Sequence, residues 1–264
     1  MRCRLTALIA MLAAFAGQSA GLAAAAAELA TYTARYDLVL EELKIPGEVA
    51  SWDGAAAIRI ARDCQKWSLR VETAFTLSLG GGSVFKFYSV EKYRESLDGT
   101  RLEFELVLKI NGAVSDRRKG VAVLEGKGKP GRATFSIPKG KTVELPAGTE
   151  LPVAAGASLV ASLASGKTEW RQILFKWGEL MTMSHSVEAK GVSLAKQPRG
   201  DTRLTKFSGW RVNSTARRHE TSATFRLQSL VHPNGLASQY VTEQELVTYA
   251  HELVEITALR TPEC

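Results

Sequence analysis

The sequence of 264 residues predicts an all-β, mainly antiparallel fold. Apolar residues recur at every second position along most of the chain, which is the period of a strand with one buried face. Turn sequences rich in glycine and asparagine separate these segments. A helical pattern is clear in only one short segment. We therefore expect an antiparallel sheet with one wetted face, covered or plugged by a single helix.

The strands near the N-terminus alternate most clearly. The first carries apolar or aromatic side chains at alternate positions from Tyr32 to Leu40. A second runs from Trp67 to Leu79, where Gly80-Gly81-Gly82 ends it. A third runs from Leu102 to Ile110 and is followed by Asn111-Gly112, which favours a tight hairpin.

Shorter alternating segments follow, and they are Val121–Leu124, Ala133–Ile137, Ile173–Trp177 and Ala223–Leu227. Pro233-Asn234-Gly235 adds another tight turn. The stretch Glu243–Arg260 is ambiguous, because its apolar residues fit both a helical and a strand period. The pattern alone does not decide between the two.

The helix is predicted over Ala157–Ser165. Leu159, Val160 and Leu163 lie on one helical face, and Gly166 supplies the stop signal. A lone short helix in a β-rich chain usually plugs or covers a sheet, so we expect this one to be buried.

The N-terminus predicts export. Arg2 and Arg4 precede the apolar stretch Leu5–Ala16, and an alanine-rich tract ends before Glu28, as in a cleavable signal peptide. The apolar stretch is shorter than the about 20 residues that a transmembrane anchor needs. We expect residues 1–27 to be a signal peptide and residues 28–264 to form a single β-domain with a net charge of +5, since two of the 34 basic residues and none of the 27 acidic ones are removed.

Two cysteines remain after this removal, Cys64 and the C-terminal Cys264, because Cys3 leaves with the signal peptide. Two lone thiols in an oxidising compartment usually pair, so a structural disulfide is the leading interpretation. A free reactive thiol or an intermolecular bridge is the alternative. A metal site is disfavoured, since His185, His219, His232 and His251 show no ligand spacing.

The sequence predicts no catalytic, cofactor-binding or metal-ligating residues. Gly80-Gly81-Gly82-Ser83 lacks the lysine and helix of a phosphate loop, and no nucleophile elbow is present. Ser184 and His185 are neighbours, but successive side chains of a strand point to opposite faces and cannot form a dyad.

Basic clusters and aromatic residues leave two interpretations each. The clusters Arg117-Arg118-Lys119, Lys127 with Lys129, and Arg217-Arg218-His219 are either solvated loop and turn residues or an attraction for anionic envelope material. Most of the aromatic residues should be core, and this applies to the five tryptophans Trp52, Trp67, Trp170, Trp177 and Trp210. On a curved sheet they could also line an apolar groove.

Four stretches in this order resemble the EipB-type cell-envelope integrity proteins of alphaproteobacterial periplasms. They are Asp63–Leu69, Leu145–Pro152 with the helix that follows, Phe225–Tyr240, and Leu259–Cys264. The likeness covers nearly the whole chain after the signal segment. Two segments, Trp170–His185 and Arg211–Arg218, depart from the pattern of that family.

The resemblance implies an open β-spiral, a barrel-like sheet wound around one helix and closed by a Cys64–Cys264 bridge. It favours a strand for Glu243–Arg260. It also implies a periplasmic role in envelope maintenance without catalytic residues.

We therefore expect a non-enzymatic periplasmic protein that supports cell-envelope integrity by binding an envelope component or a partner protein. The alternatives are a carrier or sensor of lipid or lipopeptide in an apolar groove, and an envelope hydrolase. The expected partner is an envelope protein or an anionic lipid or cell-wall component. No cofactor, nucleic acid or transmembrane anchor is expected.

Overall fold

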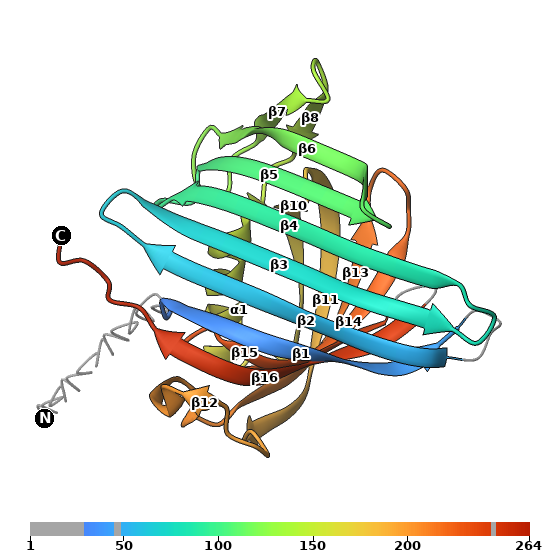
Figure 1. The fold of residues 1–264 in the computed structure, drawn as a ribbon. Coiled ribbons are helices and arrows are strands. Elements are labelled where there is room, and N and C mark those ends of the chain that lie inside the picture. The colour runs from blue at the N-terminus through green and yellow to red at the C-terminus, as the bar shows by residue number, and fades with distance from the viewer. Residues whose placement is uncertain (1–28, 45–48, 244–246) are drawn as a thin grey trace, which may run out of the picture.

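A computed structural model describes residues 29–44, 49–243 and 247–264 of the chain. The predicted signal segment lies outside these ranges. The described residues form one 16-stranded sheet and one α-helix (Figure 1), as predicted.

We call strands β1 to β8 the first half of the sheet, and they follow one another in sequence order. They are β1 (Tyr32–Leu43), β2 (Val49–Arg62), β3 (Lys66–Leu79), β4 (Val84–Ser96), β5 (Arg101–Ile110), β6 (Ala113–Leu124), β7 (Gly131–Ile137) and β8 (Thr142–Leu145).

The second half contains the remaining strands and the helices. They are β9 (Thr149–Glu150), α1 (Pro152–Ala164), β10 (Glu169–Lys176), β11 (Glu179–Val192), β12 (Arg199–Gly200), the 3-10 helix η1 (Thr202–Thr205), β13 (Gly209–Arg218), β14 (Thr224–Val231), β15 (Ala237–Glu243) and β16 (Val247–Ala258).

The two halves join where the first strand pairs with the last. The order is β8-β7-β6-β5-β4-β3-β2-β1-β16-β15-β14-β13-β11-β10-β9, with β12 beside β16. All pairs are antiparallel except β9 with β10 and β12 with β16. Within the stretch that the pattern left ambiguous, Val247–Ala258 is strand, and it pairs with β1.

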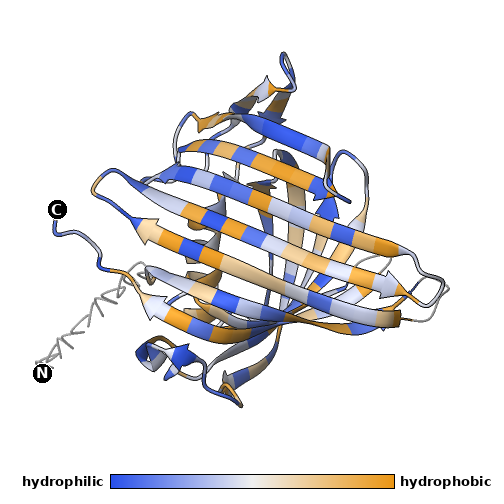
Figure 2. Ribbon diagram, in the orientation of Figure 1, coloured by the Kyte–Doolittle hydropathy of each residue, from blue (hydrophilic) through white to orange (hydrophobic). Residues whose placement is uncertain are grey.

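Alternation gives the sheet two distinct faces, seen as alternating hydrophobic and hydrophilic bands along the strands in Figure 2. On β1, Tyr32, Ala34, Tyr36 and Leu38 are buried, and the residues between them are more exposed. We call the side with these buried residues the inner face and the other the outer face. The predicted turn at Asn111-Gly112 joins β5 to β6, and both residues have positive φ.

One end of the sheet overlaps the other, because β10 packs against strands β5 to β7. On β10, Ile173 and Phe175 pack against the inner face of β5 to β7, where the rings of Phe175 and Phe104 lie 5.4 Å apart. Gln172, on the opposite face of β10, contacts the carbonyl of Ala155 in α1. The second part of β10, from Gln172 to Phe175, is therefore covered on both faces, which makes the fold the barrel-like spiral that the resemblance implies.

Helix α1 fills the inside of the winding. Val153, Val160 and Leu163 pack against Val212 of β13 and Val231 of β14. The helix ends as predicted, at Gly166 with φ of 83°.

The predicted start of this helix is wrong, because it begins at Pro152 and not at Ala157. Proline is well tolerated in a first helical turn. The buried carboxylate of Glu95 on β4 accepts hydrogen bonds from the backbone amides of Val153 and Ala154 at 2.7 and 2.8 Å. A residue distant in sequence thus caps the helix, and a local pattern could not reveal it.

A second correction concerns Trp177, which was predicted as the end of a strand. Strand β10 ends at Lys176, and Trp177 and Gly178 form the turn to β11 with φ of 57° and 71°. The strained φ of Trp177 is compatible with the ring contacts that hold it, since Lys176 and Arg218 both lie over its face.

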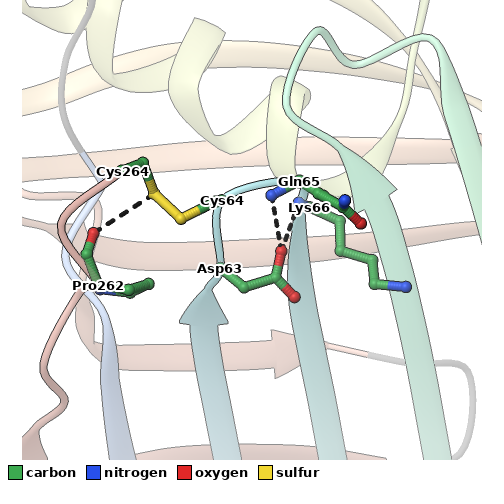
Figure 3. The surroundings of a disulfide bond; sticks show 6 residues. All are labelled: Asp63, Cys64, Gln65, Lys66, Pro262 and Cys264. Carbon is green, nitrogen blue, oxygen red and sulfur yellow. Dashed lines mark hydrogen bonds between the residues drawn. A yellow bond between two sulfur atoms is a disulfide. The ribbon is translucent and has the colours of Figure 1, made fainter.

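The predicted disulfide joins Cys64 and Cys264 with Cα atoms 5.5 Å apart (Figure 3). Cys64 lies in the turn between β2 and β3. There Oδ1 of Asp63 accepts hydrogen bonds from the backbone amides of Gln65 and Lys66, both at 2.8 Å. These bonds lower the pKa of Asp63. The bridge ties the chain end beyond β16 to a hairpin of the first half.

No helix in the described ranges is long and apolar enough to cross a membrane.

Candidate functional site: a polar groove on the outer face

A groove of about 780 Å³ crosses the outer face of the second half. It runs over six strands, β10, β11, β13, β14, β15 and β16, and reaches Glu41 of β1. Its lining is Glu41, Glu169, Trp170, Arg171, Ser184, His185, Ser186, Asn213, Ser214, Thr215, Arg226, Leu227, Gln228, Val241, Glu243 and Thr248.

Strand register explains why these residues gather. Two rows of outer-face side chains run from strand to strand, and they lie two residues apart on each strand. The arginine row is Arg171, Ser184, Thr215, Arg226, Glu243 and Thr248; the amide row is Glu169, Ser186, Asn213, Gln228 and Val241. Two residues along a strand span about 6.6 Å, which sets the distance between the rows.

The floor of the groove is backbone. Trp170, His185, Ser214 and Leu227 lie between the rows, and their side chains belong to the opposite, inner face. Their amide and carbonyl groups are already used by the antiparallel ladders. The side chains of the two rows are therefore the groups that a bound molecule would meet.

The amide row is held in a fixed orientation. The Nε2 atom of Gln228 donates to Oε2 of Glu188 at 2.8 Å and to Oδ1 of Asn213 at 3.1 Å. Asn213 donates through Nδ2 to the same Glu188 oxygen at 3.2 Å. Because both donors of the Gln228 amide are used, its Oε1 atom remains as an acceptor.

The arginine row carries charge at both ends. Arg226 lies 3.4 Å from Glu243, which also accepts a hydrogen bond from Lys44 at 2.8 Å. That bond lowers the pKa of Glu243. Arg171, at the other end, has no carboxylate within ion-pair distance among the described residues. Thr248 is 9 % exposed, and within the same ranges its Oγ1 atom has no hydrogen-bond partner.

Beneath the floor, three polar side chains form a network on the inner face. Nδ1 of His185 lies 2.8 Å from Oγ of Ser214, and its Nε2 lies 3.2 Å from Oε1 of Gln172. The Gln172 amide group donates to the carbonyl of Ala155 and to Glu150, so its oxygen faces the histidine. Nε2 of His185 therefore carries the proton and Ser214 donates to Nδ1. Burial lowers the pKa of His185 to about 4, so the ring is neutral at pH 7.

This serine–histidine pair was not predicted. Ser184 does point away from His185, as the sequence indicated, and the partner Ser214 comes from the neighbouring strand. A second pair has the same form, because His232 contacts the carbonyl of Phe207 at 2.6 Å and Oγ of Ser238 at 2.7 Å. Both members of the second pair are fully buried, which is typical of a structural contact.

The basic clusters lie in different environments. Arg118 and Arg218 lie 3.5 and 3.6 Å from the buried carboxylate of Glu179, and burial raises the pKa of that carboxyl. The prediction of loop or turn positions is wrong for these two arginines, because they lie in β6 and β13 and their side chains are partly exposed. Lys127 and Lys129 lie in the turn between β6 and β7, where the prediction holds.

The tryptophans border the core and are partly buried. Trp67, Trp170 and Trp210 pack against the cluster around α1. Trp52 stacks on Phe75 at 4.7 Å, and Phe75 stacks on Phe87 at the same distance. These three rings form a row on the inner face of β2, β3 and β4.

No group of three or more potential ligands that could hold a metal ion occurs in the described part of the chain.

The groove could not be found from the sequence, because its members come from strands up to 207 positions apart, from Glu41 to Thr248. The available signal was the run of hydroxyl and amide residues on one face of predicted strands, such as Asn213 and Thr215. Only the register shows that these runs align.

A family model described as EipB-like matches residues 23–260. A crystal structure described as a beta-barrel-like protein of domain of unknown function DUF1849 from Brucella abortus is similar with a TM-score of 0.76. The match covers 89 % of this chain and 100 % of that chain at 16 % sequence identity, which shows the fold. No curated protein matches the chain.

Proposed function

The chain belongs to the EipB-like family, and on that premise we propose a non-enzymatic periplasmic protein that supports cell-envelope integrity. It acts by binding an envelope component or an envelope protein in the groove on the outer face. The observation that carries the proposal is the pair of rows, whose hydroxyl, amide and charged side chains line one groove across six strands.

Two features support a place outside the cytoplasm. The N-terminal segment has the composition of a secretory signal peptide. The Cys64–Cys264 disulfide is of a kind that persists in oxidising compartments. Fractionation of cells that express the full chain should place the protein in the periplasmic fraction, with residues 1–27 removed.

A binding role fits the serine–histidine geometry better than hydrolysis does. Ser214 is 9 % exposed and lies on the inner face, on the far side of the floor from the groove. A substrate in the groove could not reach its hydroxyl group without opening the sheet. The amide of Gln172 occupies the place that an orienting carboxylate takes in a catalytic triad.

Deletion of the gene tests the proposed role. The deletion strain should become more sensitive to detergent and to cell-wall antibiotics, and the wild-type gene supplied in trans should restore resistance. Unchanged survival of the deletion strain under both treatments would contradict the proposal.

A second candidate is a carrier or sensor of lipid or lipopeptide. The stacked row of Trp52, Phe75 and Phe87 on the inner face favours it, since partly exposed aromatic rings suit an acyl chain. Phe85, beside this row, is 37 % exposed. Native mass spectrometry of gently purified protein should show a bound lipid if this candidate is correct, and consistently empty protein would exclude it.

A further inference from the structure

We propose that the outer groove binds an extended glycan strand that bears amide groups, such as N-acetylated sugars. The inference rests on the groove being the binding site of the proposed function, and it names the chemical class of the ligand.

The lining argues against an acyl chain. Val241 is the one aliphatic side chain in the two rows, and the others are hydroxyl, amide or charged groups. Burying these groups against hydrocarbon would leave their hydrogen bonds unmade, at a free-energy cost for each. Ligands rich in hydroxyl and amide groups can satisfy them.

Charge argues against a strongly anionic polymer. The cationic residues of the lining are Arg171 and Arg226, and its anionic residues are Glu41, Glu169 and Glu243. With two cations and three anions, the net formal charge is −1. A polyphosphate or a surface of anionic lipid would be repelled or at best not attracted, whereas a neutral or weakly charged glycan is compatible.

Spacing argues against a peptide. Along the groove, one position of each row recurs per strand, and neighbouring strands lie about 4.8 Å apart. The sugars of an extended glycan repeat at a similar distance, so successive sugars keep step with successive strands. An extended peptide advances about 3.3 Å per residue, so it would fall out of step with the strands.

The position of the groove supports the same conclusion. Peptides commonly bind to a sheet by adding a strand at a free edge, where backbone groups are unpaired. The free edges here are β8, β9 and the start of β10, where residues 169–172 pair with β11 alone, and the groove crosses the interior of the sheet from β11 to β16. Over these interior strands the floor offers no backbone partners, so side chains must recognise the ligand.

The fixed amide row supplies the specificity for amides. Glu188 holds Asn213 and Gln228, and this leaves Oε1 of Gln228, a residue of the lining, as an acceptor. Such an acceptor suits the N–H of an acetamido group. Nearby hydroxyls of Ser184, Ser186 and Thr215 can donate to or accept from sugar hydroxyls.

The test is calorimetric titration of the purified chain, without residues 1–27, with N-acetylglucosamine oligomers of two to six sugars. Six strands give five strand spacings, so affinity should rise with length up to about five or six sugars and then level off. The all-hydroxyl glucose hexamer should bind at least tenfold more weakly. Equal binding of the two hexamers would overturn the amide requirement.

The double variant Asn213→Ala/Gln228→Ala should weaken hexamer binding at least tenfold. Gln239→Ala is the matched control, because it changes a glutamine of β15 that lies outside the lining. Absence of hexamer binding to the folded wild-type protein, or tighter binding of an alanine hexapeptide, would overturn the glycan assignment. The two proposals can fail separately. If the hexamer does not bind but the groove variants still fail to restore a deletion strain, the proposed function is supported and the glycan class is not.

Such glycans occur in the cell wall and on membrane glycolipids, and co-sedimentation distinguishes the two sources. Purified wall sacculi and vesicles containing glycolipid are incubated separately with wild-type protein and with the double variant. Retention of wild-type protein alone by either one supports the proposal and identifies the source. Equal retention of both proteins, or of neither, contradicts it.

Discussion

The two halves of the sheet have similar inner faces and different outer faces. In the first half, charged side chains on the outer face pair with one another, as Lys92 and Arg117 do with Glu105 at 3.8 and 3.3 Å. A depression of about 210 Å³ there is bordered by several charges, among them Arg70 and Lys109. In the second half, hydroxyl and amide groups line a groove of about 780 Å³.

The difference lies in what each outer face offers to solvent and to a ligand. Exposed ion pairs keep a surface solvated and contribute only about 0–1 kcal/mol each to stability. Neutral polar groups with spare donors and acceptors gain more from a ligand that matches them. Apolar inner residues support both halves alike, and in the proposed function the outer face of the second half is the one that binds.

The largest effect on stability is expected from breaking the contact between the two halves. Phe175→Ala removes a fully buried ring that packs on Phe104 of β5, and it should lower the free energy of unfolding by about 3–5 kcal/mol. Phe207→Ala, at a position 55 % exposed, is the control and should cost less than about 0.5 kcal/mol. Denaturant unfolding measures both. Equal effects would show that the overlap of β10 with β5 is not a stabilising contact.

Removing the disulfide releases the chain end from the first half. Cys64→Ser/Cys264→Ser should lower stability by about 2–4 kcal/mol, and the separation of 200 residues places an entropic upper bound near ~5 kcal/mol. The melting temperature of the oxidised wild type should fall to that of the variant when reductant is added. Two free thiols in the unreduced, denatured wild-type protein would refute this account.

Glu95 connects the first half to α1 and should make stability depend on pH. Burial raises its pKa from 4.5 to about 7, so the folded state favours the protonated carboxyl. The stability from this preference is complete below pH 4.5 and is lost as the pH rises to 7, a change of about 3 kcal/mol.

Glu95→Gln removes that titration. Its unfolding free energy should therefore change less than that of the wild type between pH 4.5 and 7, as measured by denaturant unfolding at several pH values. Parallel curves for the two proteins would mean that Glu95 is ionised at little cost in the folded state.

Ser214→Ala sharpens the distinction between binding and hydrolysis. It should cost about 1–3 kcal/mol by leaving Nδ1 of His185 without its donor, and Ser238→Ala should cost a similar amount at His232. Neither serine should react with a fluorophosphonate probe in the folded protein. Specific labelling of Ser214 would restore the hydrolase alternative.

The smallest stability effects are expected on the outer faces themselves. Lys92→Ala in the first half and Gln228→Ala in the second should each change the free energy of unfolding by less than about 1 kcal/mol. Thermal melts of the two variants should be nearly superimposable on that of the wild type. A large loss for Gln228→Ala would assign the amide row a structural role.

The parts of the fold that could be predicted came mostly from local sequence patterns. The alternation from Tyr32 to Leu40 and from Leu102 to Ile110 identified strands and their buried faces, since period-two burial is a local property. The turn at Asn111-Gly112 was equally visible. The start of α1 was missed because its cap, Glu95, lies 57 positions before Pro152.

The groove was beyond prediction for a related reason. Gln228 and Asn213 become neighbours only through the register of β13 with β14, and the row extends to Glu169 through two further pairings. A shift of one residue in any pairing would place these side chains on the inner face. Composition could suggest polar strands, but not a continuous row.

The most direct test asks which outer face the cell requires. A deletion strain is supplied with Asn213→Ala/Gln228→Ala or with the matched pair Lys92→Ala/Glu105→Ala from the first half, at equal protein levels. The first-half variant should restore resistance to detergent and cell-wall antibiotics, and the groove variant should not. Full restoration by the groove variant would contradict the assignment of function to the groove.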